Sequence, residues 1–309
     1  MVPSLKPFRF AVQTSSARDG HAWREQARRI EALGYSTLYL PDHFDDQWGP
    51  LVALTVAAEA TTSLRVGGLV FDNDYRHPLV LAKEIATLDL VSEGRVELGL
   101  GAGWLRGDYD AAGIAYDEPS VRIDRLTEAL DVLDQLWGGT ATYEGAHYRL
   151  RDAVAAPATR RPPLVIGGGG RRVLQLAARR ADIVGVNPNL GSGKVDESTA
   201  RSAVAALYDE RIGWIRDAAG ERFDALELQA LTFLVAVDGN RAELAHQMAP
   251  GLGISEDEAL DVPIALVGSV DEICEQLVER RERWGLSYWV VHGPEVEDFA
   301  PVVARLAGT

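Results

Sequence analysis

The chain has 309 residues, of which 47% are hydrophobic and 25% charged, an ordinary balance for a folded protein with room for a ligand pocket. Its formal net charge of −15 disfavours nucleic acids and anionic membrane surfaces as partners. We expect a cytoplasmic protein without a membrane span, because no apolar run reaches about 18 residues, no signal peptide is apparent, and Cys274 is the lone cysteine.

Apolar strand patterns and helical patterns alternate through the first half of the chain. Strands are predicted at residues 8–13, 37–40, 65–71 and 95–100. Helices are predicted at residues 20–33, 51–61, 78–91 and 121–137. Residues 140–150 alternate around a Glu-Gly pair, which indicates a small hairpin.

The second half continues the alternation. Strands are predicted at residues 164–166, 182–186, 226–237 and 287–291. Helices are predicted at residues 171–180, 198–219, 241–248, 269–284 and 299–306. Two polar stretches, residues 187–194 and 252–261, are predicted to be loops, the second of them mobile.

Eight strands separated by helices predict an α/β protein with a parallel sheet. In a chain of this length, eight such repeats favour a closed TIM (β/α)8 barrel over an open sheet. No shift in composition marks a boundary, so we predict a single domain over residues 1–309, with insertions near 140–150 and 187–196.

The stretch 164–172, LVIGGGGRR, predicts a buried strand, a tight turn and the start of a helix. Helix N-termini carry unpaired N–H groups and partial positive charge, and glycines allow close approach of a phosphate. This pattern favours a phosphate site at Gly168, Gly169, Gly170 and Arg171. The alternative is an ordinary strand-to-helix turn with solvated arginines.

Functional side chains of such a barrel lie at the carboxyl ends of its strands. His43 follows the second strand directly after Asp42, and histidine is suited to acid–base work at neutral pH. His292 lies at another strand end. Glycines at residues 67, 68, 99, 101 and 103 favour a flat ring packed against the barrel mouth, with close helix–strand packing as the alternative. No metal-binding motif is present.

Several motifs together resemble the bacterial-luciferase-like family of flavin and deazaflavin oxidoreductases. They are LPDHF at 40–44, RVGGLV at 65–70, YRHP at 75–78, LDLVSEGRVELGLGAGW at 88–104, the glycine turn at 163–170 and VGS at 267–269. The actinobacterial branch that uses coenzyme F420 is the most similar. The resemblance implies a TIM barrel with insertions, a homodimer, and hydride transfer between F420 and an unidentified small organic substrate.

The resemblance also implies roles for individual residues. A non-proline cis peptide is expected between Leu69 and Val70, under the ring of the cofactor. The positions that match ring contacts are Asp42, His43, Leu69, Val70, Gly101, Ala102 and Gly103. The positions that match phosphate contacts are Gly168, Gly169, Gly170 and Arg171. The histidine at the position of His43 is the catalytic base in the sugar-phosphate dehydrogenase branch.

The chain departs from that branch in two places. Asp108 stands where relatives commonly carry a glutamate, and the lysine and arginine set that holds a sugar phosphate has no match. Glucose 6-phosphate is therefore disfavoured as the substrate. Three alternatives remain: a monooxygenase using reduced FMN, a non-catalytic flavin binder, and a phosphosugar aldolase or isomerase, which lacks a lysine at a strand end.

Overall fold

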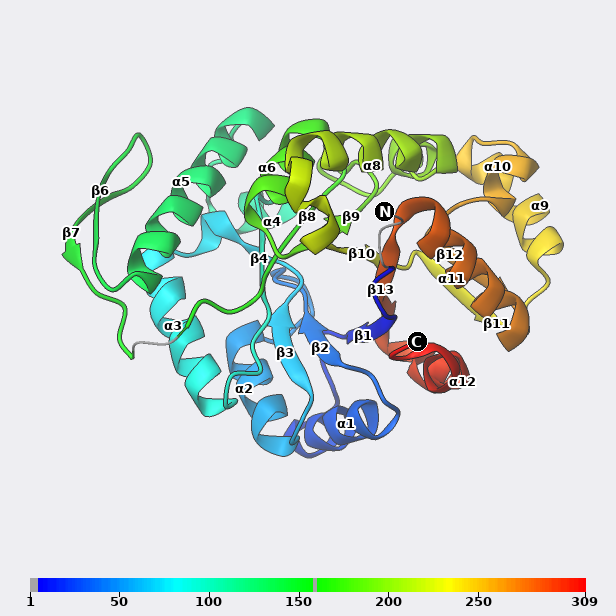
Figure 1. Ribbon diagram of the computed structural model, residues 1–309, viewed down its shortest axis with the longest axis horizontal. Helices are drawn as coiled ribbons and strands as arrows, with labels where there is room; N and C mark the ends of the chain where they lie inside the picture. Colours follow the sequence, from blue (N-terminus) through cyan, green and yellow to red (C-terminus); the bar gives the residue numbers. More distant parts are fainter. Residues whose placement is uncertain (1–4, 158–159) are drawn as a thin grey trace.

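A barrel of parallel strands occupies the centre of the molecule (Figure 1). The computed structural model describes residues 5–157 and 160–309. The main sheet has the order β3-β2-β1-β13-β10-β9-β8-β5-β4. Its strands are β1 (Arg9–Gln13), β2 (Thr37–Leu40), β3 (Arg65–Gly68), β4 (Phe71–Asp72), β5 (Leu98–Gly101), β8 (Leu164–Gly168), β9 (Ile183–Val186), β10 (Glu227–Leu231) and β13 (Leu286–His292). The predicted TIM barrel is confirmed.

The barrel closes through β3 and β4, which both belong to the predicted strand at 65–71. The peptide between Leu69 and Val70 is cis, as the family resemblance implied, and it separates the two strands. β3 pairs with β2, whereas β4 pairs with β5. The two ends of the sheet order are thus halves of one strand, and the nine strands form eight positions around the barrel.

Glycines make the seam between β3 and β5 possible. A Cβ atom on Gly67 would lie 2.1 Å from the carbonyl oxygen of Glu97, and one on Gly99 would lie 2.1 Å from the carbonyl oxygen of Gly68. At these positions the glycines are required by the close approach of strand backbones, rather than by the helix–strand packing considered as the alternative.

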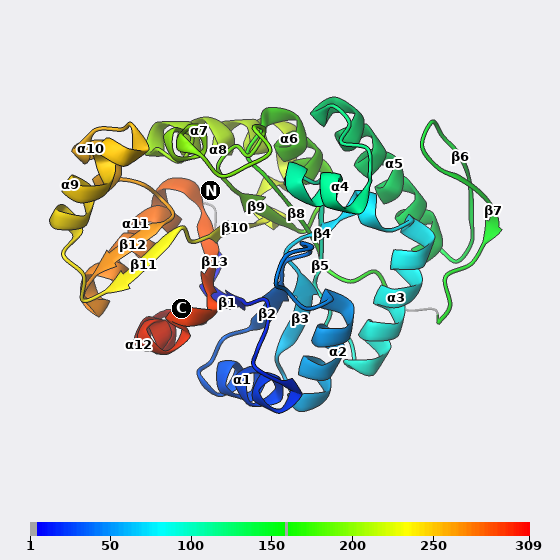
Figure 2. The ribbon, with the colours of Figure 1, turned by 180° about the vertical axis from the view of Figure 1, so that it is seen from behind.

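Helices surround the barrel in both views (Figures 1 and 2). They are α1 (Gly20–Ala32), α2 (Pro50–Ala60), α3 (Pro78–Val91), α4 (Arg106–Ala112), α5 (Pro119–Trp137), α6 (Arg171–Arg180), α7 (Glu197–Arg201), α8 (Ala205–Ala219), α9 (Arg241–Leu252), α10 (Glu256–Leu260), α11 (Val270–Trp284) and α12 (Val296–Leu306), with 3-10 turns η1 (Asn73–Tyr75), η2 (Gly220–Ala225) and η3 (Gly293–Glu295). No helix in the described part of the chain is long and apolar enough to cross a membrane.

Two small sheets lie outside the barrel, toward opposite ends of the molecule (Figure 2). The predicted hairpin at 140–150 is confirmed as β6 (Ala141–Glu144) and β7 (Arg149–Ala153), which are antiparallel. The predicted strand at 226–237 is wrong in its second half, because β11 (Leu234–Val237) leaves the barrel and pairs with β12 (Ala265–Gly268). The change occurs where Thr232 N–H donates to Val290 and Phe233 N–H donates to Ile264.

Two further predictions fail at serine-containing turns. The helix predicted at 198–219 is broken into α7 and α8, because the Ser202 hydroxyl turns back to the Thr199 carbonyl and accepts the Asn189 N–H. The loop predicted at 252–261 contains α10, which begins with a capping box formed by Ser255 and Glu258.

Candidate active site

Residues that follow β2 and β5 meet at the carboxyl-terminal mouth of the barrel. His43 Nδ1 lies 2.6 Å from Asp108 Oδ2, although the two residues are 65 positions apart. The Tyr75 hydroxyl and the Phe44 N–H also donate to this carboxylate, at 3.3 and 3.4 Å. Because an ionised carboxylate only accepts hydrogen bonds, His43 Nδ1 donates to Asp108, and in the neutral imidazole the lone pair is then on Nε2. With 21% of its side chain exposed, His43 is arranged to act as a base.

Asp42, the neighbour of His43, is buried and held from two sides. Its carboxylate accepts hydrogen bonds from the Arg76 guanidinium at 2.5 and 3.0 Å. The backbone N–H of Asp72 donates to it at 3.1 Å. The side chain therefore fixes the loop after β2 relative to the end of β4. Its contact with a cofactor ring stays a prediction.

A second buried carboxyl group, that of Asp72, ends β4. The Tyr109 hydroxyl lies 3.2 and 3.1 Å from its two oxygens, and the Asp74 N–H donates to it at 2.9 Å. Burial, with the charges of Asp74 and Asp42, raises the pKa of Asp72 to about 7. Asp72 therefore titrates near neutral pH in direct contact with the loop that carries His43.

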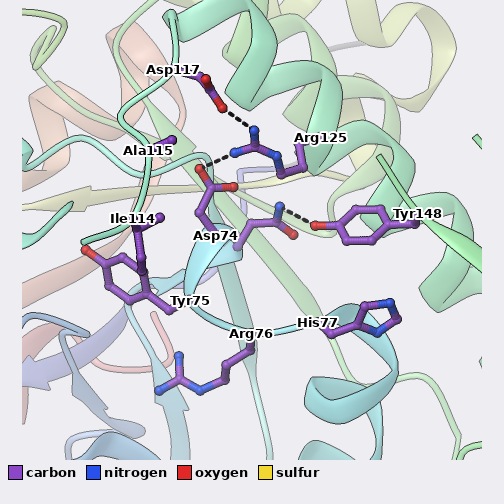
Figure 3. Close-up of a pocket in the computed structure, with 10 residues that line it drawn as sticks. Asp74, Tyr75, Arg76, His77, Ile114, Ala115, Asp117, Arg125 and Tyr148 are labelled. Carbon is purple, nitrogen blue, oxygen red and sulfur yellow. Dashed lines mark hydrogen bonds and ion pairs between the residues drawn. The ribbon is translucent and has the colours of Figure 1, made fainter. Parts of the chain in front are cut away.

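A cavity of about 350 Å³ lies beside the segment that follows β4 (Figure 3). It is lined by Asn73, Asp74, Tyr75, Arg76, His77, Ile114, Ala115, Asp117, Arg125 and Tyr148. Arg125 bridges Asp74, at 2.7 Å, and Asp117 on one wall. Tyr75 lines the cavity and also reaches Asp108, so the cavity is linked to the His43 pair through one side chain. Its charged wall suits a small polar molecule.

The predicted glycine turn joins β8 to α6. A Cβ atom on Gly169 would lie 2.2 Å from a backbone oxygen of the loop after β9, so packing requires this glycine. A Cβ atom on Gly170 would meet nothing within 4 Å. Gly170 is the N-cap of α6, and no side chain caps this helix. Arg171 is exposed, and Arg172 is turned aside to Asp124. The first N–H groups of α6 therefore have no side-chain acceptor.

Two of the residues predicted on the ring side, Gly101 and Val70, are in contact. A Cβ atom on Gly101 would lie 2.5 Å from Val70 Cγ2, beside the cis peptide. Gly103 has a φ of +73°, and a Cβ there would overlap the Tyr109 hydroxyl. Because β5 and β8 are neighbours, the loop 101–103 and the glycine turn lie on adjacent strand ends.

The other strand-end histidines are engaged elsewhere. His77 Nδ1 accepts the Leu79 N–H and caps α3. His292 Nε2 lies 3.0 Å from the Thr232 carbonyl oxygen. Their arrangement leaves His43 as the candidate base at the barrel mouth.

Two functional candidates had no assigned role from sequence. Asp108 was among the residues after the fourth strand, but its pairing with His43 depends on the fold. Arg211 lies buried on α8 next to the glycine turn. The sequence could have indicated its burial, because it shares a helix face with the apolar residues Tyr208, Ile212 and Ile215. Charged residues at such positions are rarely buried without a partner.

Comparison with known proteins identifies the family. The sequence profile described as luciferase-like monooxygenase matches residues 2–288. The F420-dependent glucose-6-phosphate dehydrogenase of Microbacterium testaceum is 31% identical over 224 residues, which cover 68% of this chain and 65% of that protein. The enzyme of the same name from Nakamurella multipartita is 27% identical over 298 residues, covering 91% and 84%.

A solved structure agrees with the fold. The coenzyme F420 dependent tetrahydromethanopterin reductase from Methanopyrus kandleri superposes with a TM-score of 0.75 at 19% identity, over 97% of this chain and 98% of that one. The sequence match spans less than two thirds of the Microbacterium enzyme, so it is the profile match over nearly the whole chain that decides membership. The chain belongs to the luciferase-like monooxygenase family.

Proposed function

We propose that this protein transfers a hydride between coenzyme F420 and a small organic substrate bearing a hydroxyl or carbonyl group. The observation that carries the proposal is the His43–Asp108 pair at the barrel mouth, 2.6 Å apart. Relatives named for F420-dependent dehydrogenation support the choice of cofactor. When bound, the deazaflavin ring would supply the two-electron redox chemistry.

His43 would move the proton that accompanies the hydride. Its Nε2 lone pair accepts the hydroxyl proton of an alcohol, and in the reverse direction the protonated ring donates to a carbonyl oxygen. Asp108 keeps Nδ1 protonated and stabilises the charge that His43 gains. Trp104, whose ring meets His43 edge to face at 5.6 Å, limits the access of water.

The residues present fit an anionic, flat cofactor. The ring would lie against Leu69 and Val70 and the loop Gly101–Ala102–Gly103, with Asp42 and His43 at its edge. The phosphate would bind at Gly168, Gly169, Gly170 and Arg171. The open space at Gly170 and the uncapped N-terminus of α6 support this placement.

The substrate we propose is not a sugar phosphate. The chain has three lysines, Lys6, Lys83 and Lys194. Lys6 binds the Ala225 carbonyl at the opposite end of the barrel, Lys83 lies on α3, and Lys194 approaches Asp196. Lys194 lies in the loop after β9 at the barrel mouth, but its ammonium faces Asp196, which favours a neutral alcohol or ketone over a sugar phosphate.

Side-by-side binding of F420 and FMN tests the proposed cofactor. We expect fluorescence titration of the purified protein to give a micromolar or lower Kd for F420 and at least about tenfold weaker binding of FMN. Tighter binding of FMN, with substrate-dependent oxygen consumption, would favour a monooxygenase instead. Binding of F420 without turnover of any alcohol or ketone in a broad panel would favour a non-catalytic binder.

We also propose that the chain forms a homodimer. The neighbouring helices α2 and α3 expose Val52, Val80 and Leu90, a set of apolar side chains that a second copy would cover. Light scattering is expected to give twice the chain mass of 33.5 kDa, and Val52→Lys is expected to lower it. A mass of one chain for the unmodified protein would contradict this proposal.

A further inference from the structure

A buried arginine lies directly behind the glycine turn. Arg211 is 3% exposed, and its Nε donates to the Gly169 carbonyl oxygen at 3.1 Å. Its Nη1 is buried without an acceptor, and within the described residues no carboxylate forms an ion pair with it. The Tyr208 ring lies 5.2 Å from its guanidinium carbon. Arg122 and Arg280 are also buried with unpaired N–H groups, but of these three arginines it is Arg211 that bonds the glycine turn, so its charge lies where it would balance an anion bound there.

The contact with Arg211 also sets the direction of the turn. In a trans peptide the C=O and the next N–H point opposite ways, so the Gly170 N–H points away from Arg211. The Gly168 carbonyl accepts the Asn187 N–H at 3.0 Å, which turns the Gly169 N–H away from β9 in the same manner. These donors precede the free N–H groups at the start of α6.

We propose that Arg211 is a positioning residue for a phosphate group bound at this turn. It holds the Gly169 peptide so that the following N–H groups face the ligand, and its charge balances the phosphate from behind. This inference rests on the proposed function, which places the cofactor phosphate at the same turn. The ligand class is a phosphate mono- or diester.

A purely structural role would not need this side chain. A neutral donor could satisfy the Gly169 carbonyl without placing a charge in the interior, and burial lowers the pKa of Arg211 because the charged form is poorly solvated there. The charge of Arg211 therefore favours phosphate binding but disfavours the stability of the ligand-free protein. Loss of the guanidinium should weaken phosphate binding, whereas the stability of the ligand-free fold should change little, because relief of the buried charge offsets the lost hydrogen bond to the Gly169 carbonyl.

The test compares ligands with and without phosphate. For Arg211→Met, we expect the Kd for F420 to rise at least tenfold, while the Kd for the phosphate-free deazaflavin riboside changes less than twofold. Arg211→Lys, which keeps the charge, is expected to fall between Arg211→Met and the unmodified protein. Arg216→Met removes the same charge from an exposed position of the same helix and should change neither Kd.

Thermal unfolding of the ligand-free variants completes the test. We expect the Tm of Arg211→Met to stay close to that of the unmodified protein. A lowered Tm with equal weakening of both ligands would make Arg211 merely structural and overturn the inference. Unchanged F420 binding by Arg211→Met would overturn it while leaving the proposed function intact. Failure of the unmodified protein to bind F420 or FMN would overturn both.

Discussion

Replacing His43 with alanine is expected to lower kcat by about 10²- to 10⁴-fold, the usual contribution of a positioned acid–base group. The imidazole is held at its Nδ1 by Asp108 at 2.6 Å, which leaves Nε2 as the proton acceptor. Alanine removes that acceptor, so the substrate hydroxyl proton would have to pass to water. The Kd for F420 should change far less than kcat, because the phosphate and most of the ring would be held by other residues.

Asp108→Asn separates orientation from charge. Asparagine keeps the shape and can still accept from Nδ1 through its oxygen, but it no longer stabilises a protonated His43. We therefore expect kcat to fall in this variant too, by less than in His43→Ala. Adding the alanine substitution to Asp108→Asn should cost little more than His43→Ala alone, because the two residues act as one unit.

The measurement is steady-state turnover with the best alcohol or ketone from the panel, paired with F420 titration of each variant. His246→Ala is the matched control, because His246 also pairs with a carboxylate, Glu256 at 2.7 Å, but lies exposed on α9. It should retain full activity. Full turnover by His43→Ala would remove this residue from the mechanism, and lost F420 binding would indicate a role in holding the ring.

Local sequence signals located the elements that surround the site. The glycine turn ended a buried strand and opened α6 at Arg171 as predicted, since both boundaries are set by residues adjacent in the chain. The helix α3 was likewise predicted from its Pro78 start. His43 was assigned to a strand end because β2 stops at the preceding Leu40-Pro41.

Local sequence patterns could not predict the contacts between segments that are distant in the chain. The pairing of His43 with Asp108 depends on how the loops after β2 and β5 converge. The departure of β11 from the barrel depends on its pairing with β12, and the helices α9 and α10 separate these two strands in the chain. In the sequence Arg211 is one charged residue of a predicted helix, and its contact with Gly169 follows only from the fold. A single sequence does not indicate which residues of distant segments come into contact.

The end of the barrel opposite the site is closed by a buried charged network. Glu97, 1% exposed, accepts from Arg9 Nη2 at 2.5 Å and from the hydroxyls of Tyr39 and Tyr288. Arg65 Nε lies 2.7 Å from the same carboxylate, as an ion pair without hydrogen-bond geometry. Arg9 and Arg65 are the first residues of β1 and β3. The network therefore ties several strands together at their amino-terminal ends.

Glu97→Gln is expected to lower the free energy of unfolding by about 3 kcal/mol, at the low end for breaking a buried ion pair. The amide cannot balance two arginines, but Arg9 keeps Glu227 at 2.6 Å and both arginines remain about a quarter exposed, which limits the loss. Urea unfolding measures the change. Glu297→Gln, which breaks the exposed pair with Arg29, should have a far smaller effect.

Arg9→Met in the Glu97→Gln background tests whether the loss comes from the uncompensated charge. If it does, removing Arg9 restores part of the stability, and the two changes together cost less than the sum of each alone. Equal and additive losses would mean that Glu97 acts through packing instead. In either case the F420 Kd should be unchanged, because the network lies at the opposite end of the strands from His43 and the glycine turn, where barrels of this type stabilise the fold without taking part in the chemistry.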